Sequence, residues 1–340
     1  MKKDAITQVL YKGRLHDWSV RKKRQHSFSQ IHRTDCKSLI NALAVCVYLT
    51  TMLRTTMLRT RMTGLCTSLG MSVRSFASSS YGTEFVQSTS TENDHITVLT
   101  MARAKAKNAL GNQMMSEFTG ALTRLQHCKT TRCVILRSSV DGVFCAGADL
   151  KERKEMTQHE AGIFVSGLRG AFTALENLPV PVIAVIEGAA LGGGLEVALA
   201  ADIRISGERG LFGLPETGLG IIPGAGGTQR LPRLIGAQGA KELMFTGRRI
   251  GGEEAKEYGI VSYCVEDPYA KAIELAEQIC EKGPIGVKQA KIAVNSGMQT
   301  DITTGMEIER QCYAQTLTTK DRIEGLNAFR EKRKPVYIGE

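Results

Sequence analysis

A continuous apolar strand that runs into three consecutive glycines constrains this fold more than any other stretch of the sequence. PVPVIAVIEG, residues 179–188, has no polar alternation, which is typical of a strand covered on both faces of a parallel sheet. AALGGGLEVALAAD follows at 189–202 and predicts a short buried helix, and DIRIS at 202–206 has the pattern of the next strand. Strand, glycine turn, helix and strand in this order predict an α/β fold with parallel strands.

The same alternation extends along most of the chain after about residue 83. Strands are expected at ITVLTM (96–101) and at the β-branched CVILRSS (133–139). Two amphipathic helices are expected, one at 113–126 and one that opens on a capping box at 157–160. Apolar residues at helical spacing give these helices one buried face each, namely Met114, Phe118, Leu122, Leu125, Phe164, Leu168, Phe172 and Leu175.

Beyond about residue 265 the pattern becomes wholly helical. AKAIELAEQICEK predicts one helix, and Pro284 stands where a first-turn proline would start another. A last helix is expected within TTKDRIEGLNAFREKR. We therefore divide the chain into a presequence at 1–80, an α/β core at 81–265 and a helical C-terminal region at 266–340.

Charge separates the first 80 residues from the rest. The whole chain has a formal net charge of +10, but residues 1–80 hold 14 Lys and Arg against three acidic residues. Residues 81–340 hold the other 30 basic and 31 acidic residues, so this part is near neutral. An Arg-rich, Ser-rich and acid-poor N-terminus is typical of a mitochondrial transit peptide. Arg74–Ser78 resembles a matrix-protease cleavage site, so we expect a mitochondrial matrix protein.

Two alternatives stay open for the N-terminal segment. Translation could start downstream of Met1, at Met52, Met57, Met62 or Met71, or the segment could be a disordered basic tail. The apolar run at 39–53 is interrupted and shorter than the roughly 20 residues of a membrane-spanning helix. We therefore expect no membrane span.

The glycine turn before the buried helix predicts a site for a negatively charged oxygen. The first N–H groups of a helix have no intrahelical partner, and glycine lets a ligand approach them closely. A second strand followed by a glycine turn occurs at 133–150, and N–H groups from both turns could converge on one oxygen if the two strands are neighbours. Nucleotide binding fits less well, because 192–197 and 224–229 match neither GxGxxG nor a phosphate loop. Glycine selected purely for close packing stays open.

Two glutamates stand in unusually apolar, glycine-rich surroundings. Glu196 lies in the first turn of the predicted buried helix, and Glu216 lies in LFGLPETGLGIIPGAGG. Two carboxylates at one water could divide the work, one taking its proton and the other supplying a proton to carbon. Burial would raise the pKa of at least one of them toward the working pH.

Other kinds of site are disfavoured by counting. No histidine lies beyond His159, and no HExxH motif or metal-ligand cluster occurs, so we expect no metal site. The nine cysteines show no CxxC pair or regular spacing, which argues against a disulfide framework or structural zinc. Nothing near Cys145 in the sequence would activate it, so we interpret it as a packing residue.

Three motifs, CAGADLKE, AALGGGLEVALAADIRI and FGLPETGLGIIPGAGGTQRLPRLIG, closely resemble the enoyl-CoA hydratase (crotonase) superfamily over about residues 83–340. The C-terminal CYAQTLTTKDRIEGLNAFREKRKPVYIGE is most similar to the methylglutaconyl-CoA hydratase branch and to mitochondrial enoyl-CoA hydratase 2 type proteins. The resemblance implies a crotonase spiral of ββα units, with C-terminal helices that help to form homotrimers, often paired into hexamers. It also implies an acyl-CoA substrate, in fatty-acid or leucine breakdown, and no separate cofactor.

The resemblance also implies roles for individual residues. Glu196 and Glu216 match the two catalytic glutamates that add water across the 2,3 double bond. The backbone N–H groups of Ala148 and Gly193 match the oxyanion hole for the thioester oxygen. Substrate and CoA binding is implied for Gly193 and for the segment formed by Ala148, Asp149, Leu150 and Lys151.

One departure from the family pattern concerns LTMARAKAKNAL at 99–110, where relatives usually have LNRP. Loss of Asn-Arg-Pro could alter the CoA site, and Lys105 and Lys107 could meet CoA phosphates or simply be solvated. Competing activities are a crotonase-fold isomerase, an acyl-CoA hydrolase and AU-rich RNA binding. RNA binding is disfavoured because the helix at 113–126 contains no Lys and one Arg, whereas phosphate contacts need clustered basic residues.

Overall fold

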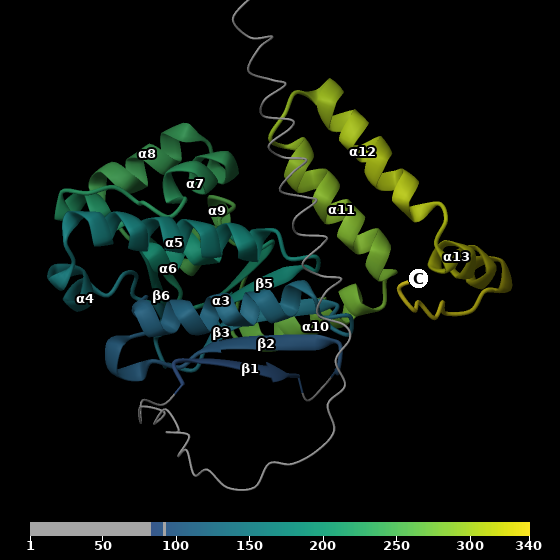
Figure 1. The fold of residues 1–340 in the computed structure, drawn as a ribbon, viewed down its shortest axis with the longest axis horizontal. Helices are drawn as coiled ribbons and strands as arrows, with labels where there is room; N and C mark the ends of the chain where they lie inside the picture. The colour runs from purple at the N-terminus through teal and green to yellow at the C-terminus, as the bar shows by residue number, and fades with distance from the viewer. Residues whose placement is uncertain (1–82, 91–92) are drawn as a thin grey trace, which may run out of the picture. The chain divides into compact units, whose positions relative to one another are not determined.

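The computed structural model describes residues 83–90 and 93–340 of the chain (Figure 1). The presequence expected at 1–80 lies outside the described residues. The described chain begins with strands, continues with alternating strands and helices, and ends with four helices after residue 265. This order agrees with the α/β class expected from the sequence.

The large sheet has six strands within the described residues, in the order β1-β2-β3-β5-β7-β10. β1 pairs antiparallel with β2, and every other neighbouring pair is parallel. All five residues of β5 are buried, as its unbroken apolar run predicts. The strands are β1 (Phe85–Thr89), β2 (Ile96–Met101), β3 (Cys133–Ser138), β5 (Val182–Ile186), β7 (Ile203–Gly207) and β10 (Tyr263–Val265).

A second sheet of four short strands has the order β4-β6-β8-β9 within the same residues. Its strands are β4 (Val143–Cys145), β6 (Ala189–Leu191), β8 (Leu211–Gly213) and β9 (Ile250–Gly251). β4, β6 and β8 are parallel, and each follows a strand of the large sheet along the chain. Because helical segments follow each such pair, the chain winds as repeated strand–strand–helix units. The predicted spiral of ββα units is confirmed.

Helices cover both faces of the large sheet. α3 (Asn112–Gln126), α5 (Gln158–Glu176) and α6 (Gly193–Leu199) share one buried cluster with alternate residues of the strands, such as Leu136. α10 (Pro268–Cys280) packs with the residues between them, such as Ile135. Successive strand residues point to opposite faces, so both faces of β3 are buried.

The remaining helices are α4 (Leu150–Glu155), α7 (Gly227–Ile235), α8 (Ala237–Thr246), α9 (Gly252–Glu257), α11 (Pro284–Gly297), α12 (Ile302–Thr316) and α13 (Lys320–Glu331), with 3-10 turns η1 (Ala104–Ala106) and η2 (Pro215–Leu219). Figure 1 shows α11 and α12 side by side, and Gly297 and Gly305 allow their close approach. Pro284 occupies the first turn of α11, as predicted.

Several expected details of these elements are confirmed. Thr157 caps α5 with the full capping box, and the predicted faces of α3 and α5 are buried except for the partly buried Phe164. β1 and α12 are among the elements that have no counterpart in the predictions from sequence. Four of the five β1 residues are exposed, and α12 buries only Cys312, so neither element carries an apolar pattern.

Gly194, in the first turn of α6, is where close packing requires glycine. A β-carbon at this position would overlap the carbonyl oxygen of Cys145 in β4. We therefore expect Gly194→Ala to lower the free energy of unfolding by about 3 kcal/mol, measured by urea denaturation. Gly167→Ala is the control, because a β-carbon there would meet, within 4 Å, no atom of the described residues beyond its own stretch of helix. Removing this glycine from α5 should stabilise the protein by about 0.5–1 kcal/mol, and equal effects of the two changes would contradict the prediction.

Candidate active site

The two glycine turns singled out in the sequence lie against each other. β3 and β5, which lead toward them, pair in parallel, and so do β4 and β6. A β-carbon built on Gly147 in the first turn would lie 2.8 Å from the carbonyl oxygen of Leu191. The same point would lie 3.4 Å from the backbone nitrogen of Gly193 in the second turn. The backbones of the two turns are therefore in direct contact.

The N–H groups of Ala148 and Gly193 are both available to a ligand. Ala148 forms an isolated β-bridge with Leu110. The bridge uses the carbonyl oxygen of Gly147 and the N–H of Asp149, so it does not use the N–H of Ala148. Gly193 is the first residue of α6, and within the described residues neither its N–H nor that of Ala148 donates to a backbone acceptor. Two neighbouring unshared donors can bind one oxygen.

Glu196 lies in the first turn of α6 and is 3% exposed. Its Oε1 accepts hydrogen bonds from the N–H groups of Ala225 and Gly227, both at 2.8 Å. Within the described residues, Oε2 accepts none. Burial raises the pKa of Glu196, while the two N–H donors and the positive charges of Arg230 and Arg169 oppose the rise. The surroundings thus favour the ionised form more than burial alone would.

Glu216 lies in η2, and its carboxylate packs against Gly192. A β-carbon on Gly192 would lie 2.8 Å from Oε1 of Glu216, and Gly192 has a φ of 53°, so both the space and the backbone favour glycine. Oε2 of Glu216 is buried and has no hydrogen-bond partner among the described residues. Burial raises the pKa of Glu216 to about 7, and the negative charge of Glu196 adds to the rise. A substantial share of Glu216 is therefore protonated near neutral pH and able to donate a proton.

A cavity of about 520 Å³ contains both carboxylates and both glycine turns. Most of its wall is apolar, formed by Leu150, Ala161, Val165, Leu168, Leu191, Leu219, Ile221 and Ile222. A larger cavity of about 750 Å³ lies among α5, α7 and α11, but neither glutamate lines it. Two carboxyl groups with raised pKa values in an apolar cavity are typical of an active site, so we assign the smaller cavity as the candidate.

Two of the four residues in the predicted substrate-binding segment line the cavity. Ala148 and Leu150 line the cavity, whereas Asp149 and Lys151 are not among its lining residues. Asp149 is buried and caps α4 by accepting hydrogen bonds from the N–H groups of Lys151 and Glu152. Burial by itself would raise the pKa of Asp149, but these bonds and a neighbouring arginine hold it below the usual value. The side chain of Asp149 therefore orders the turn.

Arg103 holds the atypical MARAKAK segment in place. Its guanidinium forms ion pairs with Asp149 at 2.8 Å and with Glu84 at 2.7 Å. Lys105 and Lys107 are exposed and do not line the cavity. Through Arg103, the segment is thus connected to the turn that contains the free N–H of Ala148.

Three basic residues that the sequence predictions do not include also line the cavity: the half-buried Arg153 and the exposed Lys154 and Arg249. None of them pairs with an acidic side chain of the described residues, and Arg153 instead lies 5.9 Å from the ring centre of Phe164. The run KERKE at 151–155 signals basic residues, but a sequence does not show which of them face a cavity formed by distant segments.

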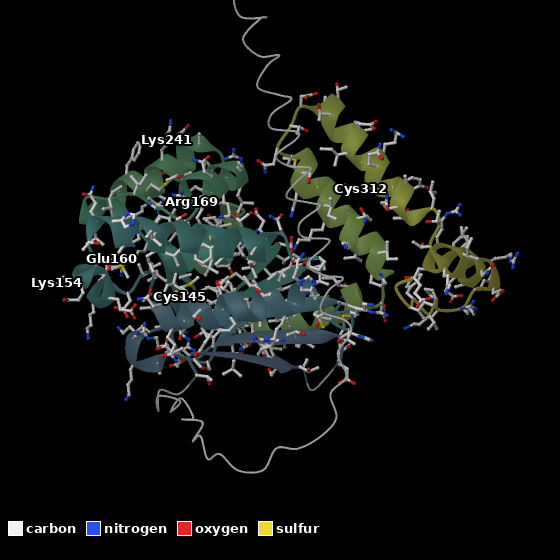
Figure 2. All side chains as sticks on the ribbon, in the orientation of Figure 1. Cys145, Lys154, Glu160, Arg169, Lys241 and Cys312 are labelled. Carbon is white, nitrogen blue, oxygen red and sulfur yellow. The ribbon has the colours of Figure 1, made fainter. Side chains whose placement is uncertain are left out.

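Cys145, labelled in Figure 2, is fully buried. Its thiol donates a hydrogen bond to the carbonyl oxygen of Asn108 at 3.0 Å. Burial raises the pKa of Cys145 to about 12, so the reactive thiolate is disfavoured. This agrees with its interpretation as a packing residue. Across the described residues, no group of three or more His, Cys, Asp or Glu side chains is arranged to hold a metal ion.

Comparisons with known proteins point to one family. The family model of enoyl-CoA hydratase/isomerase matches residues 91–340. Mitochondrial enoyl-CoA hydratase domain-containing protein 2 of Mus musculus is 49% identical over 261 residues, which cover 75% of this chain and 88% of the relative. Mitochondrial methylglutaconyl-CoA hydratase of Homo sapiens is 51% identical over 255 residues, which cover 73% and 75%. A crystal structure of enoyl-CoA hydratase from Bacillus anthracis superposes with a TM-score of 0.74 at 47% identity, covering 76% of this chain and 100% of that one.

Proposed function

The chain belongs to the enoyl-CoA hydratase/isomerase family, and we propose that its cavity hydrates 2-enoyl-CoA thioesters to 3-hydroxyacyl-CoA. One observation carries the proposal. Two glutamates with different electrostatic surroundings line one cavity, beside two unshared backbone N–H groups. The protein is accordingly a hydratase that forms a carbon–oxygen bond.

The backbone donors activate the substrate. With the thioester oxygen bound between the N–H groups of Ala148 and Gly193, electron density moves from the 2,3 double bond toward that oxygen, and C3 becomes electrophilic. The enolate that forms as water adds carries its negative charge on the same oxygen. Fixed donors aimed at a developing charge lower the barrier, by about 3–4 kcal/mol for each donor in comparable sites.

The two glutamates then move protons. Ionised Glu196, with Oε1 held by two N–H groups, offers Oε2 to the water and takes its proton as the oxygen bonds to C3. Protonated Glu216 donates its proton to C2, so the substrate gains one hydroxyl and one hydrogen. Glu196 is left protonated and Glu216 ionised, and proton exchange with water restores both. The different pKa surroundings of the two carboxyl groups suit these opposite roles.

Charge in the cavity favours an acyl chain that carries a second carboxylate. Arg153, Lys154 and Arg249 line the cavity without acidic partners among the described residues, and a carboxylate on the substrate would pair with them. The name of the human relative, methylglutaconyl-CoA hydratase, describes such a substrate. We propose a preference for carboxylated over plain short-chain enoyl-CoA, in leucine breakdown rather than general fatty-acid oxidation.

One assay tests both the reaction and the preference. The full chain is given crotonyl-CoA and 3-methylglutaconyl-CoA separately, and loss of the conjugated thioester absorbance is followed. We expect turnover of both, with kcat/KM about 10-fold or more higher for the carboxylated substrate, since a charge-assisted hydrogen bond to the half-buried Arg153 would contribute about 1.5–3 kcal/mol. Mass spectrometry should identify a 3-hydroxyacyl-CoA. A shifted double bond would indicate an isomerase and free CoA a hydrolase, and either product alone would contradict hydration.

We also propose that the chain assembles into homotrimers, alone or paired as hexamers, through its C-terminal helices. Large apolar side chains are exposed on α11, α12 and α13 and at the C-terminal end of α11, among them Val294, Met298, Ile302, Tyr313 and Phe329. An exposed apolar patch of this kind suits a contact between copies of the chain. The number of chains per particle is measurable by light scattering. Among the described residues, no helix has the length and apolar character to span a membrane.

A mitochondrial location, and the matrix in particular, is proposed from the basic N-terminal composition and the mitochondrial names of the relatives. Cell fractionation tests it.

The proposed reaction needs no separate cofactor, because CoA enters as part of the substrate. We do not propose RNA binding as a main role, because residues 81–340 are near neutral and phosphate contacts need clustered basic side chains. Filter binding of RNA at increasing salt concentration tests this.

A further inference from the structure

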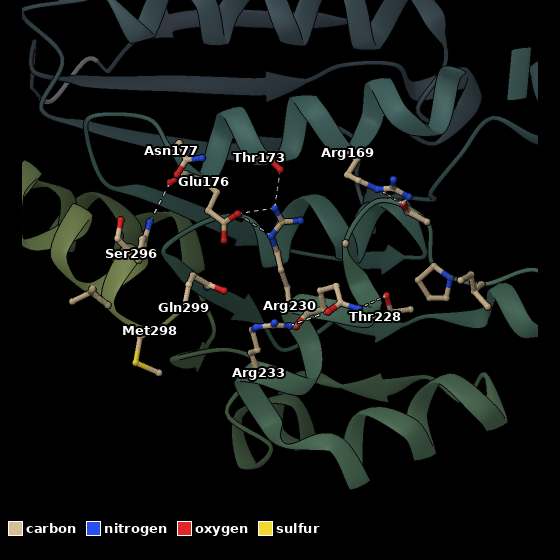
Figure 3. A pocket seen from close by; sticks show the side chains of 17 residues that line it. Arg169, Thr173, Glu176, Asn177, Thr228, Arg230, Arg233, Ser296, Met298 and Gln299 are labelled. Atoms are coloured by element: carbon tan, nitrogen blue, oxygen red, sulfur yellow. Dashed lines mark hydrogen bonds and ion pairs between the residues drawn. The ribbon is translucent and has the colours of Figure 1, made fainter. Parts of the chain in front are cut away.

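The loop 223–227 separates the active-site cavity from the larger second cavity. Ala225 lines the first, Gly226 lines the second and Gly224 lines both. Figure 3 shows the second cavity, where Thr173 and Glu176 point toward Arg230. The glycine-rich sequence of this loop fits no nucleotide-binding motif, and the hydration chemistry leaves its arginine-lined outer side unexplained.

Two arginines hold the loop from the side of the second cavity. Arg169 of α5 donates to the carbonyl oxygen of Gly224 through Nε at 3.1 Å and Nη2 at 2.8 Å. Gly224 and Ala225 share one peptide group, and the N–H of that same group binds Oε1 of Glu196. Arg169 therefore hydrogen-bonds the carbonyl oxygen of a peptide group whose N–H binds Glu196. Such chains of hydrogen bonds polarise and orient one another.

Arg230 of α7 holds the next peptide group of the loop. Its Nη1 donates to the carbonyl oxygen of Ala225 at 3.2 Å. Its own position is fixed by an ion pair with Glu176 at 2.6 Å, and its side chain is only 15% exposed. Gly226 has a φ of +120°, and a β-carbon there would overlap the guanidinium of Arg230. The glycine thus permits both the backbone turn and the approach of Arg230.

We propose that Arg169 and Arg230 are positioning residues for Glu196. They fix the loop 223–227 so that its N–H groups occupy Oε1 and leave Oε2 for the attacking water, and their positive charges favour the ionised carboxylate. This inference rests on the proposed hydration reaction. Neither arginine is among the residues that line the active-site cavity, so both act through the loop and through their charge.

The test measures the pH dependence of kcat/KM for Arg169→Gln and Arg230→Gln with crotonyl-CoA. We expect kcat to fall between about 10- and 100-fold with KM changed by less than about 2-fold, because misplaced catalytic groups slow the chemistry. We also expect the acid limb of the profile to move to higher pH. The charged groups that face Glu196 are Arg169, Arg230 and Glu216, and removing either cation leaves the repulsion by Glu216 less opposed.

Arg233→Gln is the matched control, since Arg233 lines the same second cavity from α7 but its guanidinium hydrogen-bonds, among the described residues, only Gln229. Arg169→Lys keeps the positive charge but loses the bidentate hydrogen bond to the carbonyl oxygen of Gly224. The acid limb of its pH profile should therefore match that of the wild type, while kcat stays reduced. Arg169 is exposed, so its variants should keep the thermal stability even if Arg230→Gln unfolds. An unchanged kcat and acid limb in Arg169→Gln, or equal changes in Arg233→Gln, would overturn the proposal. Absence of turnover in the wild type would instead refute the proposed function.

Discussion

Glu196→Gln should lower kcat between about 100- and 10,000-fold, measured as loss of enoyl-thioester absorbance. Glutamine has nearly the same size, and its carbonyl oxygen can accept the N–H bonds of Ala225 and Gly227. The other end of the amide cannot take a proton from water. The loss should therefore be in the chemical step, with the fold and the affinity for CoA close to those of the wild type.

The matched control for this change is Glu208→Gln, which alters an exposed glutamate that does not line the cavity. It should leave kcat and KM unchanged. Near-normal turnover of the Glu196 variant would contradict its role as base. A parallel loss of thermal stability and CoA binding would show that the glutamate acts in folding rather than in proton transfer.

Glu216→Gln should cause a loss of similar size, because an amide cannot protonate C2. The pH profile makes this prediction specific. A carboxyl group with a pKa of about 7 is protonated below that pH and ionised above it. Since the proposed acid must be protonated, kcat/KM of the wild type should fall as the pH rises through about 7. The residual activity of the variant should lack this alkaline limb, and an unaltered limb would exclude Glu216 as the acid.

The same substitution has a predictable effect on stability. The folded state raises the pKa of Glu216 above its usual 4.5, so between pH 4.5 and 7 it binds more protons than the unfolded chain. Stability therefore declines across this window as the pH rises. Glutamine is neutral and removes this decline, so the variant should be more stable than the wild type at pH 8 and not at pH 4. Stability gained where activity is lost is typical of a strained active site.

Local patterns sufficed to predict most of the core elements. The apolar run of β5, the capping box of α5 and the first-turn proline of α11 are signals carried by neighbouring residues, and the structure contains all three elements. β1 and α12 were not predictable in this way. Their side chains are largely exposed in the folded chain, so no apolar period marks them.

The same division applies to the site. Sequence alone placed Glu196 beside a glycine turn, since both belong to one strand–turn–helix unit. It also placed Ala148 in the other glycine turn, beside Gly147, but the contact between the two turns depends on the pairing of strands more than 40 residues apart. The cavity-facing Arg153, Lys154 and Arg249, and the capping role of Asp149, followed only from packing.

By itself, then, the sequence determined the α/β alternation, the two glycine turns and the two candidate glutamates, because periodicity and turn chemistry are local. Only the tertiary structure decided how the two glutamates differ. Glu196 accepts hydrogen bonds from N–H groups of the loop 223–227 and lies near the positive charges of Arg169 in α5 and Arg230 in α7. Oε2 of Glu216, in contrast, is buried without a hydrogen-bond partner among the described residues. The pKa of a carboxyl group depends on burial and on groups brought near it by folding, and these come from distant parts of the chain.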